Sequence, residues 1–187
     1  MKKIFLIAVL VLGAAAIFLS PLIKEYLAKQ EHEFTLNTSN GIIHKSDFEG
    51  KVLGVFFGYT FCPDVCPTTM STLARAISTF SEDDQKKFQA LFISVDPKRD
   101  KVDNLKEYVE FFNPTFIGAT SDRENLDDIV KRYKVYYKLI EEENSSIDYT
   151  VSHTANVYLF NKKGILVDKI SHFEGVEEVI EILRKYL

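Results

Sequence analysis

Thiols are nearly absent from this chain of 187 residues, which has only two cysteines. Both lie in one segment, Gly58-Tyr59-Thr60-Phe61-Cys62-Pro63-Asp64-Val65-Cys66-Pro67, with the spacing C-x-x-x-C. A disulfide between them would close a loop of five residues, which removes little chain entropy. The short loop argues against a disulfide whose role is to stabilise the fold. The placement of the only two cysteines in one segment favours a pair that reacts or binds a ligand.

The N-terminus lacks the sequence features of a bacterial lipoprotein and of an organelle transit peptide. No cysteine follows its apolar run, which argues against a bacterial lipoprotein, and it is not rich in Arg and Ser like an organelle transit peptide. Lys2 and Lys3 precede an uncharged run, Ile4–Ile23, whose 20 residues would span about 30 Å as a helix, the thickness of a bilayer core. We expect residues 1–23 to be an uncleaved, single-pass anchor; a signal peptide cleaved near Ala14–Ala16 is the alternative.

The lysines favour a cytoplasmic N-terminus, with the rest of the chain on the outer, periplasmic side of a bacterial plasma membrane. That side is often oxidising, so a dithiol kept there for chemistry would need a thiol reductant.

The chain after the two lysines also lacks excess positive charge. Removing Lys2 and Lys3 from the 23 basic residues leaves 21 against 27 acidic ones, a net charge of −6, which argues against a nucleic-acid partner.

Repeats, low-complexity stretches and Gly/Pro-rich linkers are also absent, so we expect one domain over residues 34–187, joined to the anchor by a polar spacer at 24–33. Apolar patterns predict strands at 52–57, 90–95, 116–119, 154–160 and 165–170. They predict helices at about 67–80, 102–112, 121–133 and 176–183, and a hairpin at the start of the domain.

The predicted order is β-α-β-α, an inserted β-α unit, then β-β-α. Alternation of this kind indicates an α/β fold with a mainly parallel sheet, and this is the order of thioredoxin-like folds. The dithiol would follow the first core strand. Because sites in such sheets lie beyond the carboxyl ends of strands, we expect Cys62, Cys66 and Asp96 at one edge.

The residues around the cysteines predict a reactive dithiol. Pro63-Asp64 suits a tight turn, and Pro67 suits the first position of a helix, which would make Cys66 the N-cap. A helix N-terminus favours the thiolate, the form that binds metal and attacks disulfides. We therefore expect a lowered pKa at Cys66.

One histidine stands out as a further ligand. His153 comes just before the strand predicted at 154–160, in the loop that faces the dithiol of thioredoxin-like folds. Two sulfurs and one imidazole nitrogen make a soft, low-coordinate site suited to copper. We expect His32, His44 and His172 to be ordinary surface residues.

These residues together resemble the Sco/SenC family of membrane-anchored copper chaperones. The matching segments are Gly58–Pro67, Val95-Asp96-Pro97-Lys98-Arg99-Asp100 and Tyr149-Thr150-Val151-Ser152-His153-Thr154. The resemblance implies a thioredoxin-like fold, copper binding by Cys62, Cys66 and His153, and delivery of copper to the binuclear site of cytochrome c oxidase, on subunit II, or reduction of its thiols. The chain departs from the family pattern at Ser152, where members commonly have an aspartate.

Acidic residues near these segments have two interpretations. Asp64 and Asp96 are candidates to support the site, although Asp64 also suits a turn, Asp100 suits a helix cap and Arg99 could pair with either acid.

The sequence leaves the activity open between two classes. The first is a copper metallochaperone, carrying Cu(I) or Cu(II). The second is a thiol–disulfide oxidoreductase with Cys62 and Cys66 as its catalytic pair. His153 favours copper, because disulfide exchange needs only thiols. A peroxidase of the same fold is a weaker third candidate, and zinc is a weaker metal because structural zinc sites usually have four protein ligands.

Overall fold

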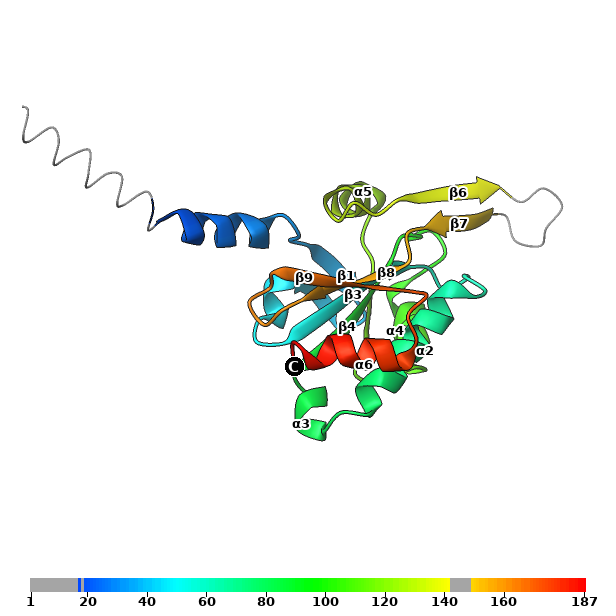
Figure 1. The fold of residues 1–187 in the computed structure, drawn as a ribbon. Helices are drawn as coiled ribbons and strands as arrows, with labels where there is room; N and C mark the ends of the chain where they lie inside the picture. Colours follow the sequence, from blue (N-terminus) through cyan, green and yellow to red (C-terminus); the bar gives the residue numbers. More distant parts are fainter. Residues whose placement is uncertain (1–16, 18, 142–148) are drawn as a thin grey trace, which may run out of the picture.

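The structure is a computed structural model that describes residues 17, 19–141 and 149–187. Most of the predicted anchor, residues 1–16 and 18, lies outside the described residues. Residues 19–30 form a helix that leads into the domain (Figure 1). Within the described ranges, no helix is long and apolar enough to cross a membrane. The anchor therefore stays a prediction.

A five-stranded sheet forms the centre of the domain, in the order β5-β4-β3-β8-β9. Its strands are β3 (Val52–Gly58), β4 (Phe88–Ser94), β5 (Ile117–Ala119), β8 (Asn156–Phe160) and β9 (Leu166–Ser171). The first three are parallel, β8 runs antiparallel to its neighbour β3, and β9 runs antiparallel to β8 and therefore in the same direction as the first three. Every residue of β3 and β4 is buried, as expected for central strands covered on both faces. All five of these strands were predicted from the sequence.

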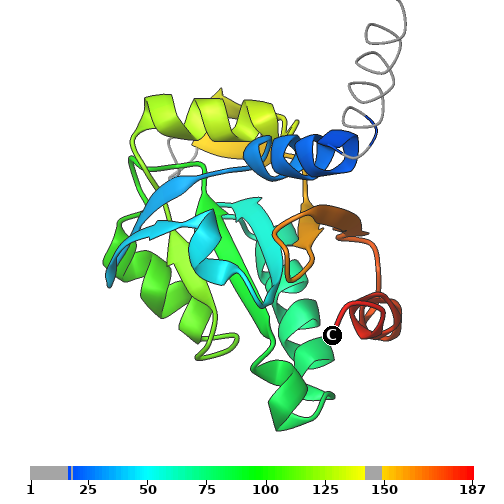
Figure 2. The same ribbon diagram turned by 90° about the vertical axis from the view of Figure 1, so that its left-hand side faces the viewer.

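Helices cover both faces of this sheet (Figures 1 and 2). On one face lie α2 (Val65–Ser78), α4 (Val102–Glu110) and α6 (Val176–Arg184), and on the other lie α5 (Arg123–Arg132) and the 19–30 helix. A short helix, α3 (Glu82–Gln85), precedes β4. All four long helices of the domain were predicted. The predicted helix at 121–133 begins with Asp122 as the N-cap of α5, and this side chain accepts a hydrogen bond from the Asn125 amide.

The N-terminal hairpin is confirmed as β1 (Thr35–Thr38) and β2 (Gly41–His44), followed by a 3-10 turn, η1 (Lys45–Phe48). His32, which we expected at the surface, is only 8% exposed. Its ring packs edge-on against Tyr133 and Phe160, with centroids 4.9 and 5.6 Å away. The expectation was wrong because the 19–30 helix folds back onto the domain, where Lys45 Nζ donates to the Lys29 carbonyl at 3.0 Å.

A second hairpin was not predicted. It consists of β6 (Tyr137–Glu141) and β7 (Tyr149–His153), which pair with each other and project from the domain beside α5 (Figure 1). His153 is therefore the last residue of a strand, opposite Tyr137, and not part of a loop as expected. Short strands that pair only locally carry weak sequence patterns, and the acidic and polar residues between them favour a loop interpretation.

Candidate metal and redox centre

Two loops meet at one edge of the sheet because β3 and β4 are parallel and in register. Gly58 at the end of β3 lies opposite Ser94 at the end of β4, and the Val95 amide donates to the Gly58 carbonyl at 2.9 Å. The segment with the cysteines therefore lies beside Val95–Asp100. This confirms that Cys62, Cys66 and Asp96 belong to the same edge.

The dithiol lies where a loop becomes a helix, but the helix begins earlier than expected. It starts at Val65 with Asp64 as N-cap, so Cys66 is inside the first turn and Pro67 follows it. The Asp64 carboxylate contacts Thr68 Oγ1 at 3.4 Å and makes no capping bond. Neither cysteine is in a disulfide, and the Cys66 amide donates to Cys62 Sγ at 3.4 Å.

The two thiols differ in their surroundings. Cys62 is half-buried, whereas Cys66 is completely buried. The pKa of the Cys66 thiol is raised, first by its hydrogen bond with Cys62, then by burial and by negative charge on Cys62. The expected lowering at Cys66 was therefore wrong: burial and the second sulfur outweigh the helix dipole. In the reduced protein, Cys66 keeps its proton and Cys62 is the accessible sulfur.

Gly58 leaves room for the Cys66 sulfur. A Cβ atom at this position would lie 2.8 Å from Cys66 Sγ and 2.8 Å from the Phe92 ring. Real Cβ atoms essentially never come this close to another heavy atom. Glycine here is therefore required by the close packing of the last residue of β3 under α2.

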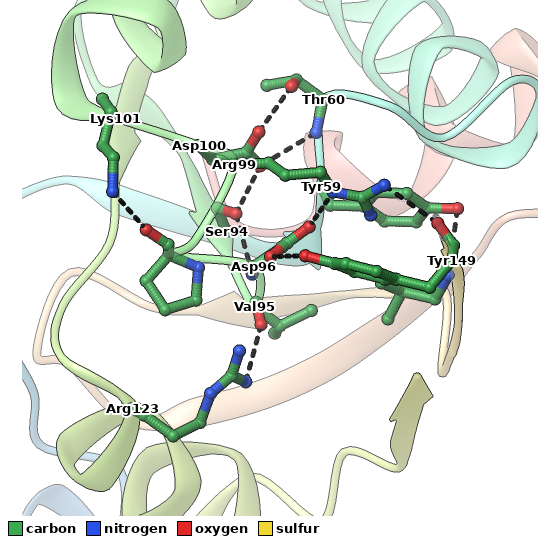
Figure 3. A network of polar contacts seen from close by, with 12 residues as sticks. Tyr59, Thr60, Ser94, Val95, Asp96, Arg99, Asp100, Lys101, Arg123 and Tyr149 are labelled. Atoms are coloured by element: carbon green, nitrogen blue, oxygen red, sulfur yellow. Dashed lines mark hydrogen bonds and ion pairs between the residues drawn. The ribbon is translucent and has the colours of Figure 1, made fainter. Parts of the chain in front are cut away.

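Asp100 holds the start of the dithiol loop and does not cap α4, which has Lys101 as N-cap. Its buried carboxylate accepts bonds from the Thr60 amide at 3.0 Å, from Thr60 Oγ1 at 2.5 Å and from Ser94 Oγ at 2.5 Å (Figure 3). The capping prediction was wrong because the loop folds back across 40 residues of sequence to use this acid. Three donors satisfy a carboxylate that would otherwise be costly to bury.

Asp96 is the centre of a second polar network (Figure 3). Its carboxylate is 0% exposed, accepts from Arg99 Nε at 2.5 Å and accepts from the Tyr149 hydroxyl at 2.8 Å. Burial and the bond to Asp96 raise the pKa of Tyr149, so this phenol remains a hydrogen-bond donor. The network joins the β4–α4 loop to β7.

A hollow of about 480 Å³ opens beside the accessible thiol. Its lining includes Cys62, Val151 and Ser152, together with His172 and Phe173 from the turn after β9. His172 is therefore at the rim of the site and not on a remote surface. The side chain of His153 lies outside what the structure describes, and among the side chains that are described no group of three or more His, Cys, Asp or Glu could hold a metal ion.

The family comparison matches residues 24–187 to SCO1/SenC. The chain belongs to the SCO1/SenC family. This confirms the resemblance inferred from the three sequence segments, and the match covers the spacer as well as the domain.

Two SCO relatives show how much of the chain is shared. The mitochondrial SCO2 homolog of Mus musculus is 33% identical over 144 residues, covering 76% of this chain and 56% of the mouse protein. The chain thus spans just over half the length of that relative. The SCO2-like protein of Rickettsia prowazekii is 32% identical over 154 residues, covering 81% of this chain and 74% of the relative.

Solved SCO structures have the same fold. The crystal structure of Arabidopsis thaliana ScoI with copper bound superposes with a TM-score of 0.75 at 34% identity, covering 82% of this chain and 95% of the other. The thioredoxin domain of a thiol-disulfide oxidoreductase from Bacteroides vulgatus superposes with a TM-score of 0.57 at 17% identity, covering 82% of this chain and 92% of that one. The fold is therefore thioredoxin-like.

Sequence reasoning missed several residues of this SCO1/SenC site. Tyr149 and Tyr59 were assigned no role from the sequence, yet the Tyr149 hydroxyl donates to Asp96 and the Tyr59 hydroxyl accepts from the Val151 amide at 3.3 Å. Arg99 was given only a pairing role. Their positions in the sequence could have pointed to the two tyrosines, because Tyr149 lies four residues before His153 and Tyr59 lies three residues before Cys62.

Proposed function

We propose that this protein carries copper, bound by the thiolates of Cys62 and Cys66 and the imidazole of His153. The observation that carries the proposal is the packing of β7 on the dithiol loop: the Val151 amide donates to the Tyr59 hydroxyl at 3.3 Å. Val151 is two residues before His153, so this contact supports a site made from both segments. Two soft sulfurs and one nitrogen fit copper, and the related ScoI of Arabidopsis thaliana was solved with copper bound.

Copper is the cargo in this proposal, and the protein supplies ligands and access. The Cys66 thiol must lose its proton on binding, so loading releases protons and weakens as pH falls. Cys62 opens onto the hollow, from which an incoming ligand of an acceptor can reach the metal without unfolding the domain. Asp96 and Asp64 support the site from the protein side, the first through Arg99 and Tyr149 and the second at the start of α2.

The acceptor in this proposal is cytochrome c oxidase, at the binuclear copper site of its subunit II. Residues 1–23 anchor the protein to a bacterial plasma membrane, 24–33 are the spacer, and 34–187 are the copper-binding domain on the periplasmic side. A thiol reductant on that side keeps Cys62 and Cys66 reduced, so that both can bind the metal. The family match and the apolar run Ile4–Ile23 support this assignment.

The second candidate is a thiol–disulfide oxidoreductase, favoured by the asymmetry of the thiols. Cys62 is accessible, whereas Cys66 is buried and retains its proton. In this reaction Cys62 thiolate attacks a partner disulfide, forms a mixed disulfide and releases one partner thiolate. Cys66 then loses its proton and attacks Cys62, which releases the second partner thiolate and leaves a Cys62–Cys66 disulfide. The partner gains two electrons, and this protein loses two.

Metal analysis separates the two candidates. The reduced full-length chain, exposed to copper and zinc together and then desalted, should retain one copper per chain and little zinc. The Cys62→Ser/Cys66→Ser variant should retain neither, and Ser71→Ala on the exposed side of α2 is the matched control. Stoichiometric copper in the double variant would overturn the proposal. Disulfide reduction without copper binding in the parent would favour the oxidoreductase.

A further inference from the structure

We propose that Arg99 is a positioning residue for the copper site: its guanidinium fastens β7 to the dithiol loop and so sets where His153 meets Cys62 and Cys66. This inference rests on the proposed function. It assigns to Arg99 a role beyond neutralising a nearby acid. The contacts that carry it come from three separate segments of the chain.

Arg99 holds β7 in two ways. Its Nη1 atom donates to the Tyr149 carbonyl at 2.9 Å, across 50 residues of sequence. The guanidinium carbon also lies 3.8 Å from the centroid of the Tyr149 ring, which is a close cation–π contact. A single side chain therefore contacts both the backbone and the ring of the residue that begins β7 (Figure 3).

The same guanidinium is fixed to the body of the domain. Its Nε atom donates to Asp96 at 2.5 Å, and Asp96 accepts from the Tyr149 hydroxyl at 2.8 Å, so the three residues close a ring of contacts. Asp96 itself is anchored, because its amide donates to Ser94 Oγ at 3.1 Å at the end of β4. Arg99 therefore joins β7, through Asp96, to the end of β4, a buried strand of the central sheet.

Arg99 also contacts the aromatic residues next to the dithiol. The guanidinium carbon lies 4.9 Å from the centroid of the Phe61 ring and 5.6 Å from that of Tyr59. Phe61 directly precedes Cys62. One planar cation thus lies between the loop that supplies the sulfurs and the strand that ends at His153.

The hairpin needs such a fastening. β6 and β7 form a two-stranded sheet with each other, and a two-stranded hairpin is marginally stable by itself. Arg123 also donates to the Tyr137 hydroxyl, which holds β6. Arg99 acts on β7, the strand with His153, and only a planar guanidinium can stack on a ring while donating two separate hydrogen bonds.

The test compares Cu(II) and Cu(I) affinities of the full-length reduced chain carrying Arg99→Lys or Arg99→Met. If Arg99 acts through His153, both variants should lose about 10- to 100-fold in Cu(II) affinity, the usual range for an outer ligand-orienting group. Cu(I), which two thiolates can satisfy, should change much less. In a His153→Ala background, Arg99→Met should cause no further loss of Cu(II) affinity, because the residue it positions has gone.

Arg132→Met is the matched control. Arg132 also donates through Nε to an aspartate on its own segment, Asp128 at 2.9 Å, and through Nη1 to a carbonyl, that of Glu33. These two partners lie on α5 and before β1, and not on β7. Equal Cu(II) loss in both arginine variants, or an additive loss in the Arg99→Met/His153→Ala pair, would overturn the positioning role.

A copper-free measurement separates failure of this inference from failure of the proposed function. In the reduced protein without metal, Arg99→Met should speed hydrogen exchange of the Val151 amide, which donates to Tyr59. Unchanged exchange would overturn the fastening. Faster exchange together with unchanged Cu(II) binding in His153→Ala would uphold the fastening while rejecting His153 as a ligand.

Discussion

The amide of Cys66 donates to the sulfur of Cys62 at 3.4 Å, so the second cysteine of the motif supports negative charge on the first. The motif by itself suggests that Cys66 is the more reactive thiolate, and the structure assigns that role to Cys62. Cys66, near the helix N-terminus, is buried and has a raised pKa, whereas Cys62, in the loop, opens onto a hollow at the surface. In the two functions proposed above, entry of copper and attack on a disulfide would both begin at Cys62.

The asymmetry predicts selective alkylation. Treating the reduced, native protein with iodoacetamide should modify Cys62 at least about tenfold faster than Cys66, because reaction requires an accessible thiolate. Peptide mapping by mass spectrometry measures both rates. In urea the two rates should become similar. Equal modification of the native protein would contradict the difference in burial.

Oxidation should prevent copper loading. Diamide removes two electrons and two protons from the pair and joins Cys62 to Cys66, so neither sulfur remains a thiolate. The oxidised protein should lose high-affinity copper, and bound copper should protect the thiols from alkylation. Competitive titration before and after treatment with a reductant measures this. The same affinity in both states would show that the cysteines are not ligands.

His153 should distinguish the two oxidation states of copper. Cu(I) is soft and satisfied by two thiolates, whereas Cu(II) gains more from imidazole. His153→Ala should therefore weaken Cu(II) binding far more than Cu(I) binding. Ser152→Asp, which introduces a carboxylate next to His153 in the sequence, should leave the stoichiometry unchanged and alter Cu(II) affinity or transfer. Cu(II) binding by His153→Ala at the parent's affinity would remove His153 from the site.

Gly58→Ala should lower the stability of the domain more than an ordinary glycine substitution does. The new Cβ would come within 2.8 Å of Cys66 Sγ and of Phe92, so the domain should lose about 1–3 kcal/mol through overpacking. Gly175→Ala is the control, since its Cβ would meet the end of the flexible Glu178 side chain. Urea midpoints of both variants test this, and equal midpoints would contradict the close packing.

Buried His32 predicts a pH dependence of stability. Burial lowers its pKa from the usual 6.5, with charge on Lys45 acting in the same direction and Glu31 opposing it. The unfolded chain therefore takes up a proton near pH 6.5 while folded His32 stays neutral to lower pH. This part of the stability is present above about pH 6.5 and is lost as pH falls below it.

Urea midpoints measured across this range should fall less with pH in His32→Leu than in the parent. His44→Gln, at an exposed position, is the control and should keep the parent's slope. An unchanged slope in His32→Leu would assign the pH dependence to other groups.

The sequence by itself determined the features that depend on local pattern. The apolar run before the motif became β3 and the helical spacing after it became α2, because continuous burial and a 3.6-residue period leave direct traces in residue order. The short spacing of Cys62 and Cys66, with a turn and the start of a helix between them, predicted that they lie close together. The order of strands and helices then determined which loops share the edge of a parallel sheet.

The tertiary structure alone decided how these residues act. Whether Cys66 is a thiolate depends on its contact with Cys62 and on the burial of the first turn of α2, which no spacing encodes. Asp100 bonds Thr60 across 40 residues, and Arg99 bonds Tyr149 across 50. His32 became a core residue only because the 19–30 helix returns to the domain. Burial and charge pairing are properties of neighbours in space, so the motif predicted the chemistry of the site while the fold decided which atom carries the charge and what holds β7 beside it.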